Sequence, residues 1–170
     1  IDKRPGVTIP RILKHWGWVF LGNFAGALTV AVLMAAVYTY GFATEPNEIG
    51  NKIAHIGENR TIGYKEYGFG GWMTIFIRGM LCNWMVSLGV IGAMVSTSVS
   101  GKFIAMWKPV MLFFAMGFEH SVVNMFLFPF AMMMGGDFAI MDYFLWNEIP
   151  VALGNLVGGL ALTGLALYTT

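Results

Sequence analysis

The sequence predicts an all-α integral membrane protein, built as a bundle of four spanning helices of which the third is broken. Of its 170 residues, 57% are hydrophobic and 11% are charged, whereas soluble domains carry about 25% charged residues. Four apolar stretches are close to or longer than the roughly 20 residues that a helix needs to cross a bilayer. The third stretch contains Gly117 and a polar cluster that interrupt it.

Composition also limits the partners and cofactors. A net charge of +1 argues against a nucleic-acid partner, which would need a strongly basic surface. The single cysteine, Cys82, excludes a disulfide framework within the chain. We expect no enzymatic activity, because the sequence has no recognisable nucleophile–base motif, and no metal or cofactor, because it has no His-Glu-x-x-His motif. Residues 1–170 should form one transmembrane domain in the lipid bilayer.

Polar segments between the apolar stretches predict the orientation. Residues 1–15 and the loop at 98–108 are basic, whereas the connectors at 41–69 and 135–149 hold most of the acidic residues. Basic segments of membrane proteins face the cytoplasm, so both ends of the chain should lie there. The longer connector also has room for a surface helix. The expected spans are residues 16–40, 72–97, 103–134 (broken) and 150–168.

A short motif recurs in the first and fourth spans. Residues 22–26 read Gly-Asn-Phe-Ala-Gly and residues 154–158 read Gly-Asn-Leu-Val-Gly, and small residues at this spacing let helices approach closely. Three crossings separate the copies, so they run in opposite directions, as in the inverted repeats of transporters. A repeat of three spans would place two more spans before Ile1, so that this chain holds four of an expected six. Chance recurrence is the competing explanation, because the chain has 22 glycines.

Glu119 and His120 are the only carboxylate and the only imidazole inside the predicted spans. An acidic side chain at the centre of a membrane helix costs roughly 2.5–3.5 kcal/mol, so such residues usually mark ion or proton paths. An imidazole titrates near neutral pH, so it can attract a weak-acid anion and share a proton with it. We therefore predict that His120 protonates or stabilises a small anion in a pore. The competing interpretation is a histidine held by hydrogen bonds between helices.

Four asparagines also lie in the predicted spans, and buried amides need hydrogen-bond partners. We expect them to hold the interrupted backbone open, and Glu119 to pair with a donor such as Asn83. Two other functional classes remain open. One is a structural or anchor subunit of a larger membrane complex, and the other is a proton-translocating or haem subunit, which needs a second buried histidine. The four amides are Asn23, Asn83, Asn124 and Asn155.

Three segments together resemble the formate/nitrite transporter family. Residues 117–126 (GFEHSVVNMF) resemble its fifth-helix signature, residues 78–86 (RGMLCNWMV) its fourth and residues 147–155 (NEIPVALGN) its sixth. The resemblance covers essentially the whole chain, as helices three to six. It implies a multi-pass protein of the cell inner membrane with an aquaporin-like fold of six spans. It also implies a homopentamer with one pore in each subunit.

The resemblance further implies a permeant and a set of site residues. The permeant would be a small monovalent anion such as formate, nitrite or hydrosulfide, carried with or without a proton. Asn155 would face the loop that interrupts the second helix of the family. The implied positions are His120 at the centre of the pore, Phe113 at its outer constriction, Val86 at its inner constriction, Asn124 and Asn155 along it, and Glu119, Asn83 and Lys65 in a polar network.

The sequence departs from the family pattern at two places. The family tends to carry a lysine shortly before the fourth helix, where this chain has Tyr67, so Lys65 is the candidate for that role. Glu148 stands directly before Ile149-Pro150, where the family pattern has an apolar residue. This difference predicts that the outer vestibule of the pore differs from that of the family. The family's second helix, with its interrupted loop, lies outside this sequence.

Overall fold

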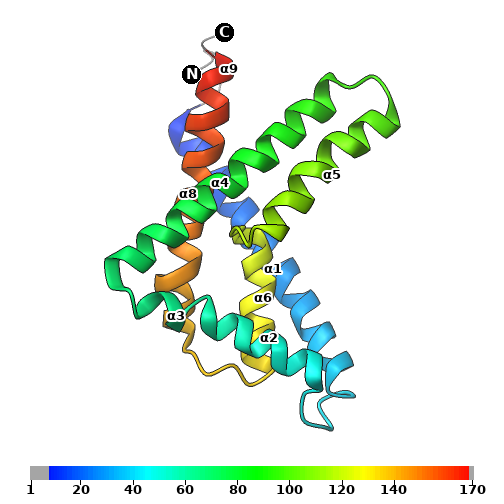
Figure 1. Cartoon of the computed structure of the whole chain (residues 1–170), viewed down its shortest axis with the longest axis vertical. Coiled ribbons are helices and arrows are strands. Elements are labelled where there is room, and N and C mark those ends of the chain that lie inside the picture. The colour runs from blue at the N-terminus through cyan, green and yellow to red at the C-terminus, as the bar shows by residue number, and fades with distance from the viewer. Residues whose placement is uncertain (1–7, 169–170) are drawn as a thin grey trace.

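The computed structural model describes residues 8–168, and its secondary structure there is helical (Figure 1). Three helical segments are long and apolar enough to cross a membrane, namely residues 9–38, 68–95 and 140–168. The elements are α1 (Ile9–Tyr38), α2 (Glu48–Asn59), α3 (Ile62–Lys65), α4 (Gly68–Val95), α5 (Val99–Ala115), α6 (Ser121–Met133), α7 (Ile140–Tyr143), η1 (Phe144–Glu148), α8 (Ile149–Gly159), η2 (Leu160–Gly164) and α9 (Leu165–Tyr168).

The predicted third span is interrupted, as expected. Helix α5 returns along α4 as an antiparallel partner, the chain leaves helical geometry at residues 116–120, and α6 then continues beside α1 (Figure 1). Gly117 has a φ of +62°, a conformation that a residue with a Cβ adopts only at a cost. Pro129 lies inside α6 without ending that helix.

Two predicted boundaries were wrong. The first helix begins at Ile9 rather than at residue 16, so it takes in His15. The last helical segment begins at Ile140 rather than at residue 150, because α7, η1 and α8 follow one another without a loop. Pro150 has no N–H, so the α-helical bond that it would donate is absent. Just before it, the backbone hydrogen bonds follow the π-helical pattern, with the N–H of Ile149 donating to the carbonyl of Phe144 five residues earlier.

The polar connector does form a surface helix, α2, which packs on α6. Its start is fixed by Asn47, whose side-chain oxygen accepts hydrogen bonds from the backbone N–H groups of Ile49 and Gly50 at 3.1 and 3.0 Å. Ala54 faces inward and joins a small apolar cluster with residues of α1 and α6. The connector is therefore folded onto the interrupted helix rather than extended into solvent.

Glycines bring α4 and α8 into close backbone contact. A Cβ at Gly154 would lie 2.2 Å from the carbonyl oxygen of Phe76, and one at Gly158 would lie 2.0 Å from that of Met80. By contrast, a Cβ at Gly22 or Gly26 in α1 would meet nothing within 4 Å. The prediction of close helix approach therefore holds within this chain for the second copy of the motif and not for the first.

Glu58 ties the end of α2 to the turn after α6. Its Oε1 accepts a hydrogen bond from the backbone N–H of Asp137 at 2.9 Å, and this bond is the main reason that the pKa of Glu58 lies below its ordinary value of 4.5. Because its pKa is lower in the folded state, ionised Glu58 contributes to the free energy of unfolding at neutral pH. This contribution is lost as the pH falls from the ordinary value of 4.5 through the lower pKa of the folded state.

We expect the Asp137 amide to lose protection from hydrogen exchange as the pH is lowered through this range, after correction for the intrinsic exchange rate. Glu58→Gln should have lower protection already at neutral pH, because an uncharged amide oxygen is a weaker acceptor. Glu45→Gln is the matched control, since Glu45 is exposed. Equal protection in wild type and Glu58→Gln would contradict the expectation.

Candidate functional site

The interruption between α5 and α6 is held by one side chain of α8. Asn155 Oδ1 accepts the backbone N–H of Ser121 at 3.0 Å, and its Nδ2 donates to the carbonyls of Glu119 and Gly79 at 3.0 and 2.8 Å. Asn83 of α4 donates to the backbone carbonyl of Asn155 at 2.6 Å. Three helices are therefore joined at the break, and Asn155 satisfies two of the backbone groups freed there, the Ser121 N–H and the Glu119 carbonyl.

Glu119 belongs to a closed ring of four residues from three parts of the chain, which we call the carboxylate ring. Its Oε2 accepts from Asn124 Nδ2 at 3.0 Å and from Arg60 Nη1 at 3.5 Å. Asn124 Nδ2 also donates to Asn147 Oδ1 at 2.7 Å, and Asn147 Nδ2 donates to the carbonyl of Arg60 at 3.0 Å. Glu119 is fully buried, while 29% of the Arg60 side chain is exposed, so the guanidinium connects a buried carboxylate to the surface.

His120 precedes α6 and lies against the predicted outer constriction. The rings of His120 and Phe113 stack with their centroids 6.1 Å apart, and Phe113 is itself buried. The Nδ1 atom of His120 is buried and finds no hydrogen-bond partner among the described residues. A buried polar atom without a partner is costly, and here it leaves the imidazole free to bind a polar ligand. The alternative, in which hydrogen bonds hold the histidine between helices, gains no support from Nδ1, because this atom makes no such bond to a described residue.

Two predicted network residues lie elsewhere. Lys65 was expected beside Glu119, but its ammonium pairs with Asp142 Oδ1 at 2.8 Å and half of its side chain is exposed. The cation that reaches Glu119 is Arg60, from the turn between α2 and α3. Asn83 was expected to pair with Glu119, but it is linked to that residue only through Asn155. Val86 lies half-buried one turn further along α4.

Glu148 was expected in an outer loop and is instead buried in η1. Only 1% of it is exposed, and its carboxyl group accepts hydrogen bonds from Ser121 Oγ at 2.5 Å and Tyr143 OH at 2.8 Å. The π-helical turn before Pro150 rotates this residue inward, which the charge pattern of the sequence does not reveal. Glu148 therefore lies beside the residue that follows His120.

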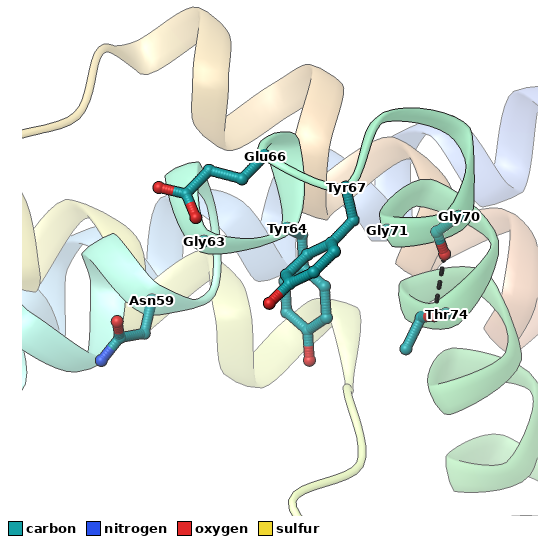
Figure 2. A pocket seen from close by; sticks show the side chains of 8 residues that line it. All are labelled: Asn59, Gly63, Tyr64, Glu66, Tyr67, Gly70, Gly71 and Thr74. Carbon is teal, nitrogen blue, oxygen red and sulfur yellow. Dashed lines mark hydrogen bonds between the residues drawn. The ribbon is translucent and has the colours of Figure 1, made fainter.

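A cavity of about 720 Å³ opens where α3 meets the start of α4, away from His120. In Figure 2 the rings of Tyr64 and Tyr67 lie on its wall, and the Gly70 carbonyl accepts a hydrogen bond from Thr74 Oγ at 2.8 Å on the far side. Tyr64 is also the hydrogen-bond acceptor of Arg78. Arg78 thus has a hydrogen-bond partner inside this chain.

Sequence reasoning missed three residues of the site. Asn147 opens the sixth-helix segment, so a signal for it was present. Ser121 lies within the fifth-helix segment, but the family resemblance assigns it no role. Arg60 gave no signal, because it is one charge among many in a polar connector and only the folded chain brings it to Glu119.

These features define a class: a helical membrane protein whose interrupted helix carries a buried carboxylate and an unpaired histidine nitrogen. The sequence profile of the formate/nitrite transporter family matches residues 3–169, and the chain belongs to that family. It is 36% identical over 168 residues to a probable formate transporter of Methanothermobacter thermautotrophicus, covering 94% of this chain and 58% of that protein.

Other relatives agree with this assignment. The formate channel FocA of Haemophilus influenzae is 31% identical, over 93% of this chain and 59% of its own. A solved pentameric formate channel with formate bound has a TM-score of 0.79 at 25% identity, covering 97% of this chain and 68% of that one. A solved FNT family ion channel has a TM-score of 0.77 at 26% identity, over 96% and 62%. The chain thus spans less than two thirds of the length of these curated relatives.

Proposed function

We propose that the protein passes small monovalent weak-acid anions across the membrane, with formate or nitrite as the first candidates and hydrosulfide as the third. The observation that carries the proposal is the buried, unpaired Nδ1 of His120 at a helix interruption, beside the ring of Phe113. The names of the relatives, a probable formate transporter and formate channels, support the same class of permeant. These names also support a transporter or channel rather than an enzyme.

In the proposed mechanism, the anion loses its water where apolar side chains narrow the path and meets His120 there. A protonated imidazole attracts the anion and donates a hydrogen bond to it. Sharing or transferring that proton makes the permeant nearly neutral, which lowers the cost of crossing an apolar segment. The carboxylate ring fixes Glu119 through its Oε2, which accepts hydrogen bonds from Arg60 and Asn124.

We also propose the finer architecture that the family resemblance implies. The chain would supply four spans of a six-span, aquaporin-like protomer built from an inverted repeat, with α1 ending the first copy and α8 ending the second. The uncovered face of Gly22 and Gly26 supports this, because the matching glycines of α8 pack tightly on α4. Assembly as a homopentamer is supported by the pentameric formate channel. We place the protein in the cell inner membrane.

The function is tested by flux of formate, nitrite and hydrosulfide into proteoliposomes that hold the full-length protein, over a range of external pH. Protein-free liposomes give the background, which matters because the neutral acids cross lipid unaided. We expect saturable, protein-dependent flux of at least one anion. If none exceeds the background, the pore is ruled out for these permeants and the structural-subunit alternative takes its place.

Arg60 is expected to raise the local concentration of anions at the vestibule, since its guanidinium is partly exposed and lies over the interruption. A positive charge in a cleft raises association rates by about tenfold or more, so Arg60→Gln should lower anion flux by about tenfold at low salt and less at high salt. Lys65→Gln is the matched control, because it removes one charge from the same connector at a residue paired with Asp142. An equal loss in both variants would show a general surface-charge effect instead.

A further inference from the structure

Glu148 is a second fully buried carboxyl group near the interruption, and the carboxylate ring does not include it. Its side chain enters from η1, while Glu119 belongs to the break itself. Both residues are essentially without solvent exposure. Buried ionisable groups inside membrane proteins are costly and are kept where they serve ion or proton movement. Glu148 therefore requires an explanation beyond the ring.

No lysine or arginine of the described residues pairs with Glu148: the guanidinium of Arg60 is bound to Glu119, and that of Arg78 donates to Tyr64. The partners of Glu148 are two hydroxyl groups, Ser121 Oγ at 2.5 Å and Tyr143 OH at 2.8 Å. A buried carboxylate without a counter-ion is unfavourable, and the usual relief is a change of protonation state.

The two hydroxyl partners suit either charge state of Glu148. A hydroxyl group both donates and accepts hydrogen bonds, so Ser121 and Tyr143 can both donate to an ionised carboxylate. If Glu148 carries a proton, it donates to one hydroxyl and accepts from the other. Glu119 differs, since its partners Arg60 and Asn124 offer only N–H donors and so suit the charged form.

We propose that Glu148 is a proton-exchanging carboxyl group of the translocation site, separate from His120. It takes up a proton from water and releases it again, and no other bond changes. The inference rests on the proposed function, because its consequence is read in transport. The titratable or charged groups on the elements around Glu148 are Tyr143 and Asp142 on α7, Glu119 and His120 in the break, Tyr64 and Lys65 on α3, Arg78 and Cys82 on α4, and Arg60 in the connector.

The effect on transport follows from the place of Ser121. Ser121 directly follows His120. Its hydroxyl group donates a hydrogen bond to Glu148, and its backbone N–H donates one to Asn155. A negative charge on Glu148 therefore lies close to the interruption and repels an incoming anion. Protonation of Glu148 removes that repulsion, so the flux should rise with acidity through two groups rather than through His120 alone.

The test compares the pH dependence of formate flux in proteoliposomes for wild type and Glu148→Gln. Glutamine stays neutral, so flux near neutral pH should rise and the ratio of acidic to neutral flux should fall by up to about tenfold, since an ionised fraction changes by about that factor per pH unit. Glu45→Gln, at an exposed acidic residue of the connector, should keep the wild-type ratio. An unchanged ratio in Glu148→Gln overturns the inference.

Infrared difference spectra between acidic and neutral buffer supply a second measurement, which needs no transport. Wild type should show the carbonyl band of a protonated carboxyl group, and Tyr143→Phe should shift it, because one hydrogen bond to Glu148 is lost. The absence of a band that responds to Tyr143→Phe overturns the inference even if Glu148→Gln does not fold. If wild type carries no anion but shows the band, the proposed function fails while the proton exchange of Glu148 stands.

Discussion

His120→Asn is expected to reduce anion flux at acidic pH by at least about tenfold, because an imidazolium some 4 Å from an anion contributes up to about 4 kcal/mol at an effective dielectric constant near 20. Asparagine keeps a hydrogen-bonding side chain of similar reach but carries no charge and exchanges no proton. The rise of flux with acidity should therefore flatten, leaving only the part that Glu148 provides.

The measurement is formate and nitrite flux into proteoliposomes across external pH. His55→Asn is the matched control, since His55 lies on the exposed side of α2 and pairs there with Glu58 at 3.3 Å. It should transport as wild type does. A His120→Asn protein with wild-type flux and wild-type pH dependence would remove the imidazole from the mechanism and favour a purely structural role for it.

Gly158→Ala is expected to prevent α8 from packing on α4. The added Cβ would lie 2.0 Å from the carbonyl oxygen of Met80 and 2.8 Å from its carbonyl carbon. Backbone atoms cannot turn aside as a side chain can, so the two helices must separate. Overpacking a rigid contact costs about 1–3 kcal/mol or more. Separation would also move Asn155, whose amide group holds the interruption.

The expected result is a large fall in thermal stability in detergent, or loss of the folded protein from size-exclusion chromatography. Gly70→Ala is the matched control on α4, because a Cβ there meets nothing within 4 Å. That change should be neutral or stabilise by up to about 1 kcal/mol, since alanine is the better helix former. Equal stability of Gly158→Ala and wild type would show that the close approach is not needed.

Local chemistry made part of the site predictable. Glu119 and His120 stand out because a carboxylate and an imidazole are rare inside apolar stretches, and Gly117 next to them marks the break. The break was predicted correctly because a helix interruption depends on neighbours in the chain. The cation partner of Glu119 could not be predicted in this way: Lys65 and Arg60 carry the same charge in the same connector, and only folding selects between them.

The sequence by itself determined the membrane-spanning helical class, the family and the position of the polar interruption. These follow from composition and from short segments, which act through hydrophobicity and backbone preference over a few neighbouring residues. The tertiary structure decided which groups meet: Arg60 with Glu119, and Asn155 with the broken backbone. It also decided that Glu148 is inside, because the π-helical turn at Phe144–Glu148 and the elements packed on it place that side chain against Ser121.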